Sequence, residues 1–198
     1  MAKTSAESGS DARESRRLST LLEVSQALSG TLNQRSALHK VLEILTKHHG
    51  YIRSLVVLLH DNNELHIEAA DGLDGPAHNV KYRLGEGIIG RVVESGRPIV
   101  VPRVSKEPAF LNRASKRSEA AKDELSFVCV PILLNRRAVG AIGVDIKYRA
   151  DRDYDRTVKF LGIVASNVAQ AIKIQRLKLK ASLKRSVDLV ERPAREKL

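Results

Sequence analysis

Two pairs of apolar segments, each joined by a short polar turn, constrain the fold of this chain more than any other feature. In the first pair, Ile52–His60 and Glu64–Ala70 flank the turn Asp61-Asn62-Asn63. In the second pair, Leu125–Leu134 and Val139–Ile146 flank another polar turn. Ile52–His60 is rich in β-branched and leucine residues, and Glu64–Ala70 alternates Leu65, Ile67 and Ala69 with other residues. A short turn can join only antiparallel neighbours. The sequence therefore predicts a largely antiparallel sheet.

Helical periodicity lies outside these hairpins, at both ends of the chain. From Arg13 the pattern is helical, with Leu18, Leu21, Leu28 and Leu32 at spacings of three and four and Gly30 near the end of the predicted helix. A second helix is predicted to begin with Thr31 or Asn33 as its N-cap and to end at Gly50. A long final helix is expected to begin near Asp151 or Asp153. This order of elements favours an α+β fold with five to six strands rather than a doubly wound one.

The formal net charge of +11 points toward nucleic acid, but its distribution does not. Residues 173–198 hold nine Lys/Arg against three Asp/Glu, or +6, and residues 103–122 hold six against two, or +4. Neither stretch has interleaved aromatic residues, and no helix-turn-helix or zinc pattern accompanies them. We therefore expect a solvated basic helix and a basic loop, with no direct DNA binding by this segment.

Cysteine usage and hydropathy indicate a reducing, cytoplasmic setting. Cys129 is the only cysteine, which excludes an internal disulfide and a cysteine-based zinc site. The six histidines show no metal-ligand spacing, and no apolar run is long enough for a signal peptide or a membrane span. We expect no metal site, no membrane association and no catalytic residue. Cys129 alternates with Phe127 and Pro131, as a core thiol does; a redox or chromophore role is the alternative.

Residues 80–101 carry the densest pattern of glycine and apolar residues. Gly85 and Gly87 precede a short apolar helix, Gly90 allows that helix to pack closely on a sheet, and Gly96 ends it. The same glycines superficially match a phosphate-binding loop. That loop needs a following Gly-Lys-Ser/Thr, which is missing here, so the pattern indicates backbone packing rather than nucleotide binding.

Four motifs, in this order, resemble the successive signatures of a GAF domain. They are Gly85-Glu86-Gly87-Ile88-Ile89-Gly90, Gly96-Arg97-Pro98-Ile99-Val100-Val101-Pro102, Ser126-Phe127-Val128-Cys129-Val130-Pro131-Ile132 and Val139-Gly140-Ala141-Ile142-Gly143-Val144. The resemblance covers about Arg16 to Arg176 and implies a GAF domain over residues 13–176. In that fold the terminal helices pack on one face of the sheet, and short helices and loops cover the other. We expect disorder over residues 1–12 and a basic helical linker over residues 177–198.

A finer resemblance is to the N-terminal GAF domain of the NifA family of activators. It rests on Pro108–Arg113 and Leu125–Ile132. These activators work with the sigma-54 form of RNA polymerase, so the resemblance implies a non-enzymatic sensory domain that controls an AAA+ ATPase neighbour. It also implies a downstream ATPase and helix-turn-helix, which this chain does not contain. The implied partners are a PII-type or NifL-type regulator protein, and the implied effector is a small metabolite such as 2-oxoglutarate, without a cofactor.

The resemblance places a ligand pocket between the sheet and the helix and loop after the third strand, with residues 103–123 as its lid. The residues expected to line it are Tyr82, Arg83, Glu86, Arg91, Phe110 and Arg113. Arginine offers a planar pair of donors that can grip a carboxylate, and Phe110 could provide an apolar wall. The alternative is that these arginines are solvated surface charges and that the domain binds no ligand.

The terminal helices carry apolar stripes that could also join two copies of the chain. Residues at heptad-like spacing predict a parallel homodimer bundle. Those expected to form it are Leu18, Leu21, Leu28, Leu161, Val168, Ile172 and Leu179. The alternative is that they form one wide core stripe within a single chain.

Two other functions stay open. One is a ligand-free dimerisation or protein-docking module. The other is a stand-alone GAF enzyme such as a free methionine sulfoxide reductase, which needs several reactive cysteines and therefore fits a single cysteine poorly.

Overall fold

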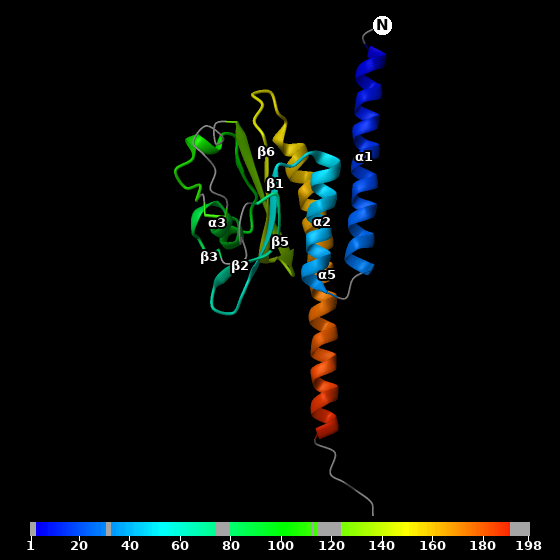
Figure 1. The fold of residues 1–198 in the computed structure, drawn as a ribbon, viewed down its shortest axis with the longest axis vertical. Coiled ribbons are helices and arrows are strands. Elements are labelled where there is room, and N and C mark those ends of the chain that lie inside the picture. Colours follow the sequence, from blue (N-terminus) through cyan, green and yellow to red (C-terminus); the bar gives the residue numbers. More distant parts are fainter. Residues whose placement is uncertain (1–2, 31–32, 74–79, 112, 115–123, 191–198) are drawn as a thin grey trace, which may run out of the picture.

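The computed structural model describes residues 3–30, 33–73, 80–111, 113–114 and 124–190. Figure 1 shows a curled sheet with three helices on one side and a short helix on the other. The three are α1 (Lys3–Gly30), α2 (Gln34–His49) and α5 (Tyr154–Val190), and the short helix is α3 (Gly87–Ser95). This confirms the predicted α+β arrangement. Within the described residues, no helix has the length and apolar character needed to cross a membrane.

The sheet has six strands in the order β3-β2-β1-β6-β5-β4, and every neighbouring pair is antiparallel. The strands are β1 (Arg53–Leu59), β2 (Glu64–Asp71), β3 (Lys81–Arg83), β4 (Ile99–Val101), β5 (Leu125–Leu134) and β6 (Arg137–Lys147). Both predicted hairpins are confirmed, and they join at the centre of the sheet through β1 and β6. The edge strand β3 was not predicted as a separate strand, because three residues carry too little periodicity to mark one.

The two hairpin turns show why each hairpin closes where it does. Asn63 takes a φ of 60°, and Asn135 and Arg136 take φ values of 50° and 67°. Two consecutive residues with positive φ make the two-residue turn that matches the twist of antiparallel strands. This corrects the second hairpin: β6 begins at Arg137, two residues earlier than the predicted Val139.

Helix α2 begins and ends as predicted. The side-chain oxygen Oδ1 of Asn33 accepts a hydrogen bond from the Ser36 N–H at 3.2 Å, which satisfies one of the free donors of the first turn. At the other end Gly50 takes a left-handed φ of 63°, and its N–H donates to the Thr46 carbonyl.

Helix α1 corrects one expectation from the sequence. It begins at Lys3, whereas residues 1–12 were expected to be disordered. A helix already anchored downstream adds one hydrogen bond for each residue it gains, so a polar segment with no strong breaker can extend it. The division into a domain over 13–176 and a linker over 177–198 stays a prediction.

Helix α5 is the longest element and runs without interruption for 37 residues. Asp153 starts it as predicted, because its Oδ1 accepts hydrogen bonds from the Asp155 and Arg156 N–H groups at 3.1 and 3.4 Å. The second half of α5 projects well beyond the sheet (Figure 1). Helix α5 ends at Val190, and residues 191–198 of the predicted linker lie outside the described part of the chain.

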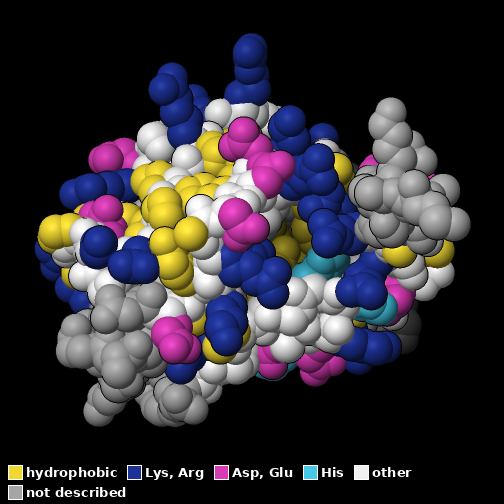
Figure 2. Space-filling view, turned by 90° about the horizontal axis from the view of Figure 1, so that it is seen from above, with side chains coloured by type: hydrophobic (Ala, Val, Ile, Leu, Met, Phe, Trp, Pro, Cys, Tyr) yellow, Lys and Arg dark blue, Asp and Glu magenta, His cyan; other side chains and the backbone are white. Residues whose placement is uncertain are grey.

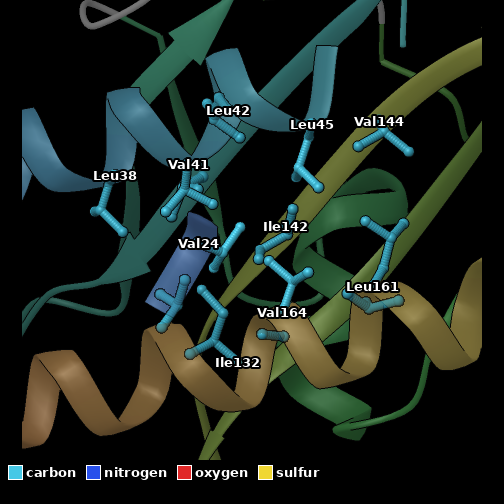
Figure 3. Close-up of a cluster of buried hydrophobic side chains, with 14 of the residues drawn as sticks. Val24, Leu38, Val41, Leu42, Leu45, Ile132, Ile142, Val144, Leu161 and Val164 are labelled. Carbon is cyan, nitrogen blue, oxygen red and sulfur yellow. The ribbon is translucent and has the colours of Figure 1, made fainter. Parts of the chain in front are cut away.

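The sheet separates two hydrophobic cores. On the helix side, Val24 of α1, Leu42 of α2 and Leu161 of α5 converge on Ile132 and Ile142 of the central strands (Figure 3). The opposite core packs α3 against the other face of the same strands. Because successive side chains of a strand point to opposite faces, each central strand serves both cores.

Candidate functional site

The entry to α3 depends on glycine. Gly87 takes a φ of 61°, and a Cβ there would lie 2.8 Å from a methyl carbon of Leu111. A Cβ on Gly90 would collide with the carbonyl oxygen of Arg83. Helix α3 therefore lies against the end of β3 and under the loop that carries Leu111, closer than any other residue type allows.

The space enclosed between α3, this loop and the sheet is small. Its walls include Tyr82, Phe110 and Leu111, together with Phe127 of β5. The rings of Phe110 and Phe127 pack edge to face with centroids 5.1 Å apart. The cavity has a volume of about 20 Å³, which accommodates roughly one water molecule. In this conformation it does not admit a metabolite.

Glu86 links the loop to the entry of α3. Its Oε1 lies 2.6 Å from Arg113 Nη2, and its Oε2 accepts a hydrogen bond of 2.8 Å from the Arg83 N–H. The hydrogen bond from Arg113, followed by that from the Arg83 backbone, lowers the pKa of Glu86 below its usual range. Glu86 therefore neutralises Arg113, which the sequence had offered as a grip for a ligand carboxylate.

The six predicted ligand-binding residues divide into three groups. Tyr82 and Phe110 line the cavity, and Glu86 and Arg113 form the ion pair at its rim. Arg83 contributes its backbone N–H, while its side chain is exposed. Arg91 is exposed on α3 and does not reach the cavity. Only part of the predicted lid, residues 103–123, lies within the described chain.

The sequence did not indicate the apolar walls of the cavity. These are Leu55, Gly87, Ile88, Ile89, Leu111, Ala114 and Phe127. Strand alternation could have indicated Leu55 and Phe127, since both point away from the helix side. Leu111 and Ala114 carry no comparable signal, because they lie in a loop without periodicity.

Cys129 is packed in the core on the α3 side, as expected of a structural thiol. It is fully buried on β5, between Ile99 of β4 and Gly143 of β6. Burial raises the pKa of the Cys129 thiol, which keeps it in its unreactive protonated form. Among the described residues, no group of three or more His, Cys, Asp or Glu side chains could hold a metal ion.

The predicted dimer stripe is mostly a core stripe. Leu161, Val168 and Ile172 are buried against the sheet of their own chain, and Leu21 and Leu28 pack at the edge of the same core. In this conformation Leu161, Val168 and Ile172 therefore serve the core of one chain, whereas Leu21 and Leu28 are only partly buried, and the homodimer seam stays a prediction. A helix that packs on a sheet and a helix in a coiled coil share the spacing of three and four, so the pattern alone could not separate them.

Further apolar side chains remain exposed on the terminal helices. Leu18 and Leu179, the other two predicted dimer residues, are 63% and 64% exposed. Residues outside the predicted seam that share this exposure are Leu22, Ile163, Ile174, Leu177 and Leu183. Helices α1 and α5 run in the same direction (Figure 1), and a groove of about 350 Å³ between them is lined by Leu28 and Ile174 among others. These exposed side chains are available for contact with a second chain.

The family model described as the GAF domain matches residues 31–173 of this chain. Solved structures agree with that match. The GAF domain of A. aeolicus nlh2 in an inactive state superposes with a TM-score of 0.72 at 21% identity, covering 82% of this chain and 99% of that one. Free methionine-R-sulfoxide reductase from Neisseria meningitidis, in complex with its substrate, gives 0.69 at 18% identity, covering 82% and 91%. At these identities the likeness shows a shared fold alone.

Curated relatives are closer in sequence. Nitrogen fixation protein VnfA of Azotobacter vinelandii is 38% identical over 160 residues, which are 79% of this chain and 31% of that protein. The Nif-specific regulatory protein of Herbaspirillum seropedicae is 34% identical, covering 80% and 30%, and that of Azospirillum brasilense is 35% identical, covering 80% and 26%. The chain thus spans less than a third of the length of each of these relatives.

Proposed function

This chain belongs to the GAF domain family, and from that premise we propose that it is the regulatory domain of a NifA-type activator of nitrogen-fixation genes. In this role it performs no catalysis itself. It controls an AAA+ ATPase neighbour that acts on the sigma-54 form of RNA polymerase. Similarity to Nif-specific regulatory proteins over about four fifths of the chain supports this assignment.

One structural observation carries the proposed mechanism: α5 is continuous from the core to the exposed end of the domain. In its first half the side chains of Leu161, Val168 and Ile172 are buried. In its second half the side chains of Leu177 and Leu183 are exposed. A shift of the sheet or of α1 therefore moves the whole helix as a rigid rod. An effector changes the output only if it binds two arrangements of this rod with different affinity.

The exposed apolar surface of α1 and α5 supports a homodimer. Because the two helices run in the same direction, two chains can form a parallel bundle around Leu22, Ile174 and Leu177. This replaces the seam that the sequence suggested, while keeping the same helices as the interface. Such a dimer would place two α5 helices side by side at the entrance to the neighbouring domain.

The input is a small metabolite or a regulator protein. A ligand such as 2-oxoglutarate could bind on the α3 side only after the Glu86–Arg113 pair opens and Phe110 moves, because the closed cavity holds about 20 Å³. That small volume favours the second candidate function, a domain that docks a PII-type or NifL-type protein without a metabolite. Isothermal titration with 2-oxoglutarate separates the two, since a docking domain gives no heat of binding.

An enzymatic role has little support. Free methionine-R-sulfoxide reductase shares the fold, but at 18% identity. Such an enzyme needs accessible thiols, and the single cysteine, Cys129, is fully buried.

The proposed function is tested by a domain exchange. This chain would replace the matching segment of the Nif-specific regulatory protein of Herbaspirillum seropedicae, and nitrogen-fixation gene expression would be measured with and without ammonium. We expect expression that still responds to ammonium. A matched control deletes the segment. If the chimera and the deletion give the same expression under both conditions, the chain is not a regulatory domain.

A further inference from the structure

A groove at the start of α5 gathers arginine side chains from three parts of the chain. It has a volume of about 330 Å³ and lies between α1, the loop from β6 to α5, and the first turn of α5. Arg13 and Arg17 come from α1, Arg149 and Arg152 from the loop, and Arg156 from α5. Figure 2, which views the end of the molecule where α1 begins, shows Lys and Arg side chains gathered on this end face.

Most of this positive charge has no partner among the residues that the structure describes. Arg156 pairs with Asp153 at 3.1 Å, and Arg152 donates to the Lys147 carbonyl at 3.2 Å. The guanidinium groups of Arg13, Arg17 and Arg149 make no ion pair or hydrogen bond with any described residue. The Nε atom of Arg152 is buried and also lacks a partner among the described residues. A buried donor such as the Nε of Arg152 is costly unless something accepts its hydrogen bond.

Acidic residues on the same groove do not cancel this charge. Glu14, Asp151 and Asp153 line it, so five arginines against three carboxylates leave a net charge of +2. Asp153 is already engaged, because it caps α5 and pairs with Arg156. The positive charge also extends below the groove, since Arg17 acts electrostatically on the buried rings of His49 and Tyr51.

We propose that this groove binds a small anion with two or more negative charges, carried on phosphate or carboxylate groups. Guanidinium groups bind both kinds of oxyanion through paired hydrogen bonds, and those of Arg13, Arg17 and Arg149 have no partner among the described side chains. The volume matches a small-molecule pocket rather than an extended peptide or nucleic acid. The site lies on the helix side of the sheet, away from the cavity under α3.

Binding in this groove has a mechanical consequence. Arg13 and Arg17 lie on α1 and Arg156 lies on α5, so one anion would tie the two helices together. The same helices carry the exposed apolar surface described above. The site thus connects an anionic ligand to the arrangement of α1 and α5 without any movement of the loop that carries Phe110. This proposal goes beyond the proposed function, because only the residues of the groove support it.

The site is tested by isothermal titration of the full 198-residue chain with pyrophosphate and, separately, with citrate. We expect one site per chain for at least one probe, with an affinity that falls as NaCl is raised. The stronger probe identifies phosphate or carboxylate as the preferred group. Replacing Arg17→Ala or Arg149→Ala should each weaken that binding about tenfold or more, the loss of one charge-assisted hydrogen bond.

Two further variants make the result decisive. Arg97→Ala removes an exposed arginine outside the groove and should leave the affinity unchanged. Circular dichroism checks that each variant is folded. The proposal is overturned if neither probe binds, if Arg97→Ala weakens binding as much as Arg17→Ala, or if only Arg113→Ala abolishes it. Because binding is measured on the isolated chain, either outcome leaves the domain exchange to be judged separately.

Discussion

At the scale of single residues, the α3 side of the sheet shows how little space separates the elements. Gly90 lies against the Arg83 carbonyl, Gly87 against Leu111, and Glu86 against Arg113. The sequence predicted that Gly90 allows close packing. It could not predict that Glu86 would occupy Arg113, because side-chain pairing across a loop depends on the folded path of that loop. Tyr82 and Phe110 lie on the cavity, and their role in ligand binding stays a prediction; the sequence did not indicate how closed the cavity is.

The importance of Gly90 can be measured directly. In Gly90→Ala the new methyl group collides with a backbone oxygen that cannot rotate away, so we expect a loss of about 2–4 kcal/mol in the free energy of unfolding. The matched control is Gly162→Ala on α5, where nothing lies within 4 Å of the added Cβ. That change should stabilise the chain by about 0.5–1 kcal/mol, because alanine favours helix. The free energy of unfolding of both variants is measured by urea titration. Equal changes in that free energy for Gly90→Ala and Gly162→Ala would contradict the close packing at Gly90.

His49 makes the stability of the chain depend on pH. Its Nε2 lies 3.1 Å from Thr20 Oγ1, and its ring centroid is 4.4 Å from that of Phe160. Burial, and then the charge of Arg17, lowers the pKa of His49 to about 4. In an unfolded chain the pKa of histidine is about 6.5. Between about pH 4 and about pH 6.5 the unfolded chain therefore binds more protons than the folded chain. The stabilising contribution is present above this window and is lost as the pH falls through it.

We expect this loss to be about 1–2 kcal/mol, allowing for partial solvent exposure of the ring. Other groups also titrate in acid, so the test compares the chain with a His49→Gln variant by urea unfolding from about pH 7 to about pH 4. The variant should lose less stability across that range. Parallel pH profiles for the two proteins would show that His49 is not responsible.

At the scale of elements, the hairpins and caps could be predicted and the role of the terminal helices could not. The turn at Asn63, the N-cap Asn33 and the stop at Gly50 each depend on local chemistry that the sequence displays. The spacing of Leu161 and Ile172 suggests a dimer seam, yet both residues pack on the sheet of their own chain. Only the three-dimensional packing shows which of two apolar faces is buried within one chain.

Two substitutions on α5 distinguish these faces. Ile172→Ala removes a buried side chain from the core and should lower the free energy of unfolding by about 2–5 kcal/mol. Leu177→Ala, on the exposed face, should change that free energy by less than about 0.5 kcal/mol but weaken self-association. Unfolding is followed by circular dichroism and self-association by sedimentation equilibrium. Unchanged self-association in Leu177→Ala would remove the exposed face from the dimer interface.

At the scale of the whole molecule, the GAF fold inferred from four sequence motifs is confirmed. The sequence did not predict the arginine groove. Arg17 and Arg149 are far apart along the chain, and only the parallel placement of α1 beside α5 brings them together. The periodicity of apolar residues along one helix does not indicate which other segment of the chain lies beside it. Predictable features are thus those set by neighbouring residues, and the two candidate binding sites are set by long-range packing.

The central claim is that α5 transmits the state of this domain as a continuous helix, and its rotational phase tests this most directly. In the chimera with the Herbaspirillum regulator, residues would be inserted after Lys180, within the exposed half of α5. At about 100° per residue, seven inserted residues return the helix to within roughly 20° of its original phase, whereas two rotate it by about 200°.

We predict that the seven-residue insertion keeps nitrogen-fixation gene expression responsive to ammonium, and that the two-residue insertion abolishes the response. Immunoblots control for equal protein levels. If both insertions respond to ammonium as the uninterrupted chimera does, α5 is a passive linker and the proposed transmission is wrong.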